Sequence, residues 1–233
     1  MSASCDPQQL AGMPLFAALS RESLQRLAAS LHSRSYPAGA SVLLAEQPGE
    51  AVYFVLSGRV RVFLEQADGS EVTIAFLGPG DVLGEMSAID LPARCASATT
   101  VEASTLLWMD RPLFQQYLKN QPALTFNLVR QLTARLRKAN EQIQALSSLD
   151  VAGRVAHQLL SLADQYGEPD EQGRLRIPLP LTQQDVADMV GATRESVNRA
   201  LAALRQEGAL DVDAGHRITV LERGALERRR ARG

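Results

Sequence analysis

The chain has 233 residues, which is long enough for two compact domains with separate hydrophobic cores. Its net charge of −2 excludes a strongly basic tail protein, although a local nucleic-acid surface stays possible because charge placement matters as well as charge sum. The two distant cysteines, Cys5 and Cys95, argue against a disulfide scaffold, a zinc site or an iron–sulfur cluster. Neither a membrane span nor a signal peptide is predicted, so we expect a cytoplasmic protein without a membrane partner.

The first part of the chain is predicted to hold a helix followed by short strands. Apolar residues at helical spacing follow Ser20, a residue type that caps helix N-termini. From residue 34 onwards, β-branched and aromatic runs alternate with turns rich in Gly and Pro, which is typical of an all-β sandwich or barrel. Asp68 and Gly69 between two such runs predict a hairpin. Residues 1–121 are therefore expected to form an N-terminal helix and a β-roll.

A helical periodicity begins near Pro122 and continues to about residue 149. Its apolar residues are spaced alternately by three and four positions, as in a two-stranded coiled coil: Val129, Leu132, Leu136, Ala139, Ile143 and Leu146. This narrow seam favours a second copy of the same helix, so residues 122–149 are predicted to make the chain a homodimer. The alternative is a long helix packed against its own domain.

Residues 150–233 contain a helix-turn-helix pattern. Thr182 and Asp185 have the spacing of a capping box, Gly191 supplies the turn, and Thr193 can cap the second helix. Polar residues then face outward near the start of this second helix, where groove reading requires them. The predicted DNA-binding residues are Thr182, Gln183, Thr193, Arg194, Glu195, Ser196, Asn198 and Arg199. The alternative is an ordinary helical hairpin with a solvated charged face.

Different roles are expected within this set of DNA-binding residues. Arg194 can pair bidentately with guanine, and Glu195 can accept a hydrogen bond from cytosine. Thr182, Gln183 and Ser196 are placed to donate to phosphates, which sets the register of the protein on DNA without reading sequence.

Three further segments of this part are predicted. Residues 165–173 read as a polar loop, and residues 209–221 as a β-hairpin wing. The Arg-rich end, residues 228–232, either adds nonspecific DNA affinity or forms a solvated tail.

A second motif, formed by Gly84, Glu85 and Arg94, has the chemistry of an anion site. A Gly-Glu step that opens a helical turn leaves backbone N–H groups free for an anion. The Arg94 guanidinium can return to the same pocket, where its planar fork matches a phosphate diester. Glu85 is suited to accepting a ribose hydroxyl. A surface ion pair would give the same sequence pattern. The position of the motif between a β-roll and a dimer helix nevertheless favours a ligand site.

Taken together, these features resemble the CRP/FNR family of transcription regulators from about Leu10 to about Arg223. The resemblance implies an α+β chain with a cyclic-nucleotide-binding β-roll, a dimerisation helix and a winged helix-turn-helix, and cyclic AMP as the effector without a metal. It implies that Glu85 holds the ribose, Arg94 the cyclic phosphate and Asn140 the adenine. The ligand set is then Gly84, Glu85, Met86, Arg94, Cys95, Ala139 and Asn140.

The resemblance also implies partners and a switch. The expected DNA site is two-fold symmetric double-stranded DNA with TGTGA-like half-sites, and RNA polymerase is an expected partner. Ligand that bridges the β-roll and the long helix would extend the coiled coil to a hinge near Asp150 and reorient the DNA-binding domains.

Two residues depart from the family pattern. Cys95 stands where the family usually has Ser or Thr, and a thiol is a poor hydrogen-bond donor. Ala139 stands where the best-known member has a hydroxyl. An alternative function therefore keeps the architecture but is ligand-independent, or answers another small molecule.

Two other classes of protein are disfavoured. An enzyme acting on a nucleotide through Glu85, Asp90 and Arg94 would need a nucleophile–base pair or a metal cluster, and neither is recognisable. A cyclic-nucleotide-binding regulatory subunit of another protein would leave the helix-turn-helix pattern unexplained. The chain is therefore predicted not to be an enzyme.

Overall fold

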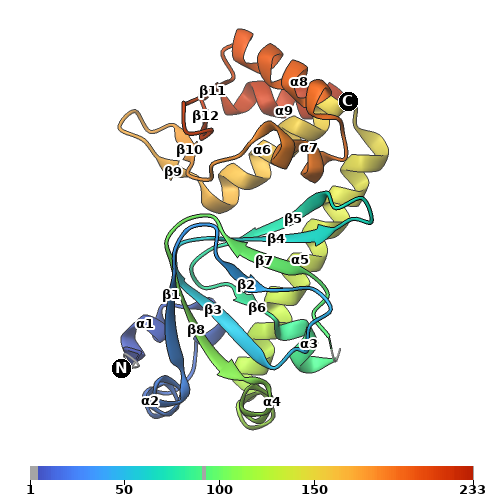
Figure 1. The fold of residues 1–233 in the computed structure, drawn as a ribbon. Helices are drawn as coiled ribbons and strands as arrows, with labels where there is room; N and C mark the ends of the chain where they lie inside the picture. Colours follow the sequence, from blue (N-terminus) through green and yellow to red (C-terminus); the bar gives the residue numbers. More distant parts are fainter. Residues whose placement is uncertain (1–4, 91–92, 233) are drawn as a thin grey trace. The chain divides into compact units, whose positions relative to one another are not determined.

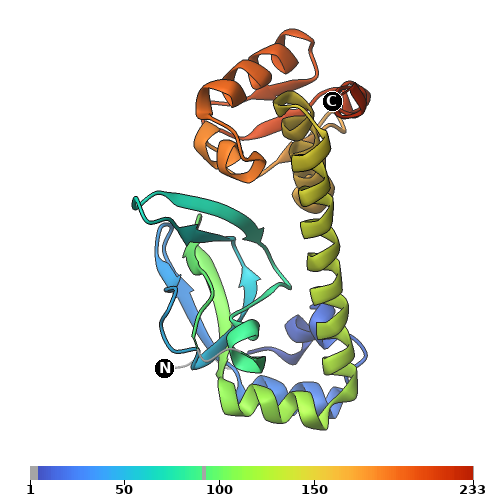
Figure 2. The ribbon, with the colours of Figure 1, turned by 90° about the vertical axis from the view of Figure 1, so that its right-hand side faces the viewer.

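The computed structural model describes residues 5–90 and 93–232. The chain divides into two compact units between residues 136 and 137. This division falls inside helix α5 (Pro122–Ser148), which therefore contributes to both units and runs unbroken through 27 residues (Figures 1 and 2).

Two antiparallel sheets build the β-roll of the first unit. One has the order β1 (His32–Tyr36), β8 (Ser104–Asp110), β3 (Ala51–Ser57) and β6 (Val82–Leu83). The other has the order β2 (Ser41–Leu43), β7 (Ser97–Thr100), β4 (Val60–Glu65) and β5 (Glu71–Leu77). Side chains from both sheets form one buried cluster, so the sheets pack face to face: Tyr36, Val55, Val60, Leu77, Leu83, Ala98 and Leu106. Gly69 has a φ of +81° between β4 and β5, which confirms the predicted hairpin.

The helices of the first unit share a second apolar core with the β3–β8 sheet. They are α1 (Pro7–Ala11), the short 3₁₀ turn η1 (Pro14–Phe16), α2 (Arg21–Ser30), α3 (Glu85–Ile89), α4 (Arg111–Asn120) and the first part of α5. Phe54 lies at its centre, with ring centroids 5.2 Å from Phe16 and 6.2 Å from Phe114. Buried Asn127 donates to two carbonyl oxygens of the N-terminal segment, at 3.1 and 2.7 Å, and this anchors the start of α5.

The second unit combines helices with a small sheet. Its further helices are α6 (Val151–Tyr166), α7 (Gln183–Val190), α8 (Arg194–Gln206) and α9 (Arg223–Arg232). The sheet has the order β11 (Leu210–Val212), β12 (Ile218–Val220), β10 (Leu175–Ile177) and β9 (Glu168–Pro169) (Figure 1). Hairpin β11–β12 confirms the predicted wing. Residues 165–173, predicted as a loop, include strand β9, because backbone pairing with β10 orders a segment that has no apolar pattern of its own.

The Arg-rich end is not a solvated tail, because residues Arg223–Arg232 form helix α9. Leu226 is fully buried, and α9 packs against α6. Arginines of α9 also pair with acids at the two ends of α6: Arg223 with Asp164 and, at 2.8 Å, Arg229 with Asp150. Of the two alternatives for residues 228–232, the tail is wrong because it overlooked the apolar anchor at Leu226 that precedes the charges, and added DNA affinity stays a prediction.

We expect Leu226→Ala to lower the free energy of unfolding of the second unit by about 2–5 kcal/mol, because it removes a fully buried leucine side chain. Differential scanning calorimetry would measure this as an earlier transition for that unit. Leu221→Ala is a matched control, since Leu221 lies in the same unit and is 37% exposed. Equal shifts for the two variants would show that the packing of α9 contributes little to stability.

Candidate functional site

The predicted anion motif forms a compact cassette in the first unit, defined here as residues 84–90 with Arg94 and Cys95. Gly84 follows strand β6 with a φ of +80° and directly precedes helix α3. A Cβ built on Gly84 would lie 2.3 Å from Nη1 of Arg94, so a side chain here would collide with the guanidinium. Glycine is therefore required both by the left-handed backbone and by the close approach of Arg94.

Arg94 is the buried cation of this cassette, with only 7% of its surface exposed. Its Nη1 donates to the Gly84 carbonyl oxygen at 3.0 Å and to Ser87 Oγ at 2.8 Å, and its Nη2 donates to the Ala51 carbonyl oxygen at 2.5 Å. All three acceptors are neutral. Burial lowers the pKa of the Arg94 guanidinium, yet arginine stays protonated in proteins. The Glu85 carboxylate attracts the guanidinium through space, but none of the described hydrogen bonds of Arg94 goes to a charged oxygen, so an anion could still pair with it directly.

Glu85 is the buried acid of the cassette, with 3% of its surface exposed. It pairs with Arg135 of α5, whose Nη1 lies 2.7 Å from Glu85 Oε1 and whose Nη2 donates to the Val82 carbonyl oxygen at 2.5 Å. Burial raises the pKa of the Glu85 carboxyl above its usual range. The Arg135 guanidinium offsets this only in part, because it is one-third exposed and therefore screened by solvent.

Sequence reasoning missed Arg135 as a member of this cluster. Arginines beside an a/d seam usually point to solvent or to a partner helix, and Arg135 fits that pattern. One signal was available: Arg135 lies one helical turn before Ala139, a position already expected at the ligand.

The structure brings together five of the seven predicted ligand residues: Gly84, Glu85, Met86, Arg94 and Cys95. Within this group the sulfur atoms of Met86 and Cys95 lie 3.8 Å apart, and both side chains are exposed. Ala139 and Asn140 lie on the part of α5 that belongs to the second unit, where both are exposed. Their contact with a ligand remains a prediction.

The helix-turn-helix forms in the second unit with the predicted caps. Thr182 and Asp185 make a reciprocal capping box at the start of α7, and Gly191 ends α7 in the left-handed region with a φ of +58°. Thr193 caps α8 by accepting from the Ser196 N–H at 3.3 Å. The inner faces of both helices are buried: Val186, Ala187, Val190, Val197, Ala200, Leu201 and Leu204.

The outward face of α8 presents the predicted base-reading groups. Arg194, Glu195, Asn198 and Arg199 are all exposed. Arg199 donates to Ser196 Oγ at 3.0 Å. The groups expected at phosphates are less uniform, because the Thr182 hydroxyl donates to its capping-box partner and the amide of Gln183 donates to Asn198 Oδ1 at 2.9 Å. A phosphate contact donated by the Thr182 hydroxyl would need its hydrogen bond to rearrange, whereas the Gln183 amide keeps a second N–H for donation.

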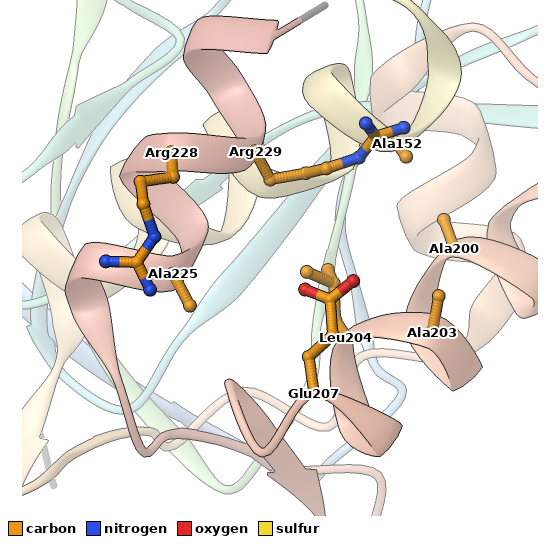
Figure 3. A pocket seen from close by; sticks show the side chains of 8 residues that line it. All are labelled: Ala152, Ala200, Ala203, Leu204, Glu207, Ala225, Arg228 and Arg229. Atoms are coloured by element: carbon orange, nitrogen blue, oxygen red, sulfur yellow. The ribbon is translucent and has the colours of Figure 1, made fainter.

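A hollow of about 250 Å³ opens between α6, α8 and α9 in the second unit (Figure 3). Arg228 and Arg229 at its rim are already paired at 2.8 Å with Glu222 and Asp150. Most of its other lining is aliphatic: Ala152, Ala200, Ala203, Leu204 and Ala225, with Glu207 as a third charged side chain. None of the predicted site residues lines it, so the candidate sites rest on the cassette and on the face of α8.

Two models of known domains match the chain. The cyclic nucleotide-binding domain matches residues 33–121, and the Crp-like helix-turn-helix domain matches residues 153–229. These matches contain the cassette and the helix-turn-helix described above. Together they define a DNA-binding transcription regulator with a cyclic nucleotide-binding domain.

Similar proteins cover almost the whole chain. The CRP-like cAMP-activated global transcriptional regulator of Mycobacterium tuberculosis is 34% identical over 94% of this chain and 97% of its own. The cyclic AMP receptor protein of Thermus thermophilus is 36% identical over 93% and 96%. The structure of the c-di-GMP responsive regulator CLP of Xanthomonas campestris matches with a TM-score of 0.72 and 25% identity, over 87% of this chain and 99% of its own.

The chain therefore belongs to the CRP/FNR family of transcription regulators. This confirms the resemblance and the α+β fold expected from the sequence. The Mycobacterium tuberculosis relative is a transcription regulator and not an enzyme. Among the described residues, no helix is long and apolar enough to cross a membrane.

We expect Arg135→Ala to lower the free energy of unfolding of the first unit by about 1–3 kcal/mol at neutral pH. The variant leaves the Glu85 carboxylate buried without its ion-pair partner and with only the weaker attraction of Arg94, so the folded-state pKa of Glu85 rises further. The loss should shrink as pH falls and Glu85 takes up a proton, and grow as pH rises through the window above the usual Glu pKa.

Thermal unfolding at about pH 5 and about pH 8 would measure this pH dependence. Arg135→Lys keeps a cation at the same position and should retain most of the stability. A loss in Arg135→Ala that is the same at both pH values would show that the contribution of Arg135 is packing and not charge.

Proposed function

We propose that the protein is a homodimeric transcription regulator that binds a two-fold symmetric DNA site under allosteric control by cyclic AMP. The observation that carries the ligand part is the buried Arg94 guanidinium, whose described hydrogen-bond acceptors are all neutral. A cyclic phosphate supplies the compensating negative charge. Glu85 would accept the ribose hydroxyl, and Asn140 of α5 would contact adenine. The names of the two relatives above 30% identity support cyclic AMP as the effector.

The proposal of a homodimer rests on the exposed apolar side chains of α5. Val129, Leu136, Ile143 and Leu146 of the predicted seam are 45–63% exposed, and Phe126 extends the row by one turn at 64%. Leu132, in contrast, is partly buried against the core of its own unit. An exposed apolar row of this length on one helix favours a second copy of that helix.

We propose a functional division into a ligand-binding part (1–121), a dimerising helix (122–149) and a DNA-binding part (150–233). Two recognition helices of a dimer would enter successive major grooves about 34 Å apart, which suits TGTGA-type half-sites. RNA polymerase is the expected protein partner. Since linkage is reciprocal, DNA should tighten cyclic AMP binding by the same factor by which cyclic AMP tightens DNA binding.

A second candidate function keeps the same fold but answers a different effector or none. Cys95 is exposed in the cassette at the position where the family usually has a hydroxyl. A weakened phosphate contact would reduce nucleotide affinity by about tenfold if it removes about 1.4 kcal/mol. The similarity to a c-di-GMP responsive regulator supports testing that nucleotide as well.

We expect cyclic AMP to tighten specific DNA binding by about tenfold or more, within the usual range of allosteric coupling. The measurement is fluorescence anisotropy with a palindromic duplex carrying TGTGA-type half-sites, with and without cyclic AMP, at one fixed salt concentration. Arg94→Gln should abolish the response to cyclic AMP while leaving the weak basal DNA binding.

Binding that is equally tight without cyclic AMP would contradict control by this nucleotide. A parallel arm with c-di-GMP then separates a different effector from constitutive binding. Failure to bind the palindrome in every arm would contradict the proposed half-sites.

We expect Arg194→Ala to weaken binding to the cognate duplex by about 1–3 kcal/mol and to relax base choice at the position it reads. Arg205→Ala is the matched control, because Arg205 lies at the far end of α8 and pairs with Asp211. Binding to a set of single-base variants of the duplex measures specificity for both proteins. Unchanged base preference in Arg194→Ala would refute its role in readout.

A further inference from the structure

Two sulfur atoms meet at the surface of the cassette. Met86 lies in the first turn of α3, and Cys95 directly follows Arg94. The Cys95 thiol donates to the Met86 sulfur across 3.8 Å. Met86 is 49% exposed and Cys95 is also exposed, so both residues lie at the surface. The second sulfur is present because this chain has Cys95 where the family usually has Ser or Thr. A hydroxyl residue at that position would place an oxygen beside Met86.

The separation of the two sulfurs suits one shared metal ion. Metal–sulfur bonds to a thiolate are about 2.3 Å long, so two of them span at most about 4.6 Å. The observed 3.8 Å lies inside that limit and allows a bent arrangement in which both sulfurs bind the same ion. No large movement of α3 relative to Cys95 is then needed.

The donor types select a soft cation. Thiolate and thioether ligands favour Cu(I), whereas Ca²⁺ and Mg²⁺ require oxygen ligands. Among the residues that the structure describes, no group of three or more His, Cys, Asp or Glu side chains is placed to hold a metal. The nearest acid of the cassette, Glu85, is buried and paired with Arg135. A borderline cation such as Zn²⁺ therefore lacks the four ligands of a structural site here.

We propose that Met86 and Cys95 form a two-sulfur site for a soft monovalent cation of the Cu(I) class, and that this cation and the nucleotide exclude one another. On binding, the Cys95 thiol releases its proton to solvent and a metal–thiolate bond forms, with no change of oxidation state. The exclusion rests on the proposed function, because Cys95 adjoins Arg94 at the expected phosphate position. The metal binding itself does not depend on that function.

The test is an anaerobic Cu(I) titration of the full chain in competition with bathocuproine disulfonate. We expect the wild type to bind one Cu(I) per chain and Cys95→Ser to lose this bound ion. Met86→Leu should bind Cu(I) at least roughly 10- to 100-fold more weakly, since even the loss of an outer-shell partner weakens metal affinity by that factor. Cys5→Ala is the matched thiol control, since Cys5 is buried, and should bind Cu(I) as the wild type does.

Two results of this titration would overturn the two-sulfur site. One is unchanged affinity in Met86→Leu, which would mean that the thiol alone binds the ion. The other is retention of one tight Cu(I) in Cys95→Ser. Circular dichroism of each variant confirms that the fold is intact.

A second titration separates this proposal from the proposed function. Saturating cyclic AMP should weaken Cu(I) binding in proportion to nucleotide occupancy, and bound Cu(I) should weaken cyclic AMP binding reciprocally. Simultaneous tight binding of both would overturn the exclusion. If the metal-free wild type binds Cu(I) at Met86 and Cys95 but does not bind cyclic AMP, the proposed effector fails while the two-sulfur site stands.

Discussion

The organisation of the ligand-binding unit depends on one buried guanidinium. Arg94 crosses from the loop after α3 to the carbonyl oxygens of Gly84 and Ala51, so it ties the end of β6 to the start of β3. Ser87 adds a third acceptor from within α3. All three hydrogen-bond acceptors are neutral, and the compensating charge comes through space from the Glu85 carboxylate, which Arg135 also shares. The guanidinium therefore has no hydrogen-bonded counter-ion among the described residues, and the cassette is arranged around it.

A second charged pair extends this arrangement to the long helix. Arg135 contacts both the Val82 carbonyl oxygen and Glu85, which flank Gly84 in the chain. The start of the cassette is therefore attached to α5 by two bonds from one side chain. A ligand could compete with Arg135 for Glu85, or could strengthen the Arg135–Glu85 ion pair. Either effect would change the free energy with which α5 is attached to the cassette. This gives a physical route from the cassette to the helix proposed to dimerise.

Much of the architecture was predictable because it depends on local rules. The caps at Thr182 and Thr193, the turn at Gly191 and the hairpin at Gly69 follow from residue type and spacing alone. The residues alone indicated an anion motif at Gly84, Glu85 and Arg94, and the family resemblance added the rest of the ligand set and the role of each residue. Arg135 was missed because its role depends on a contact fifty residues away in sequence, and charge beside a coiled-coil seam does not reveal which way it points.

The C-terminal helix was missed for a related reason. Its composition is dominated by arginine, so the sequence indicated solvent, and only the packing of Leu226 on α6 shows that the segment is anchored. Strand β9 likewise depends on a partner strand for its order. For α9 and for β9 the deciding interaction is a tertiary contact. Secondary-structure propensity and the hydrophobic pattern within the segment do not predict such a contact.

The collision at Gly84 constrains how this cassette can change in evolution. With Arg94 present, no side chain fits at Gly84, since its Cβ would lie 2.3 Å from the guanidinium and 3.1 Å from the Ala51 carbonyl oxygen. Mutational drift at the two positions is therefore ordered. Part of the steric restriction on Gly84 lifts only after Arg94 has been replaced by a shorter side chain. A descendant that replaced Arg94 would still favour glycine at position 84, because the left-handed backbone imposes its own cost on any side chain.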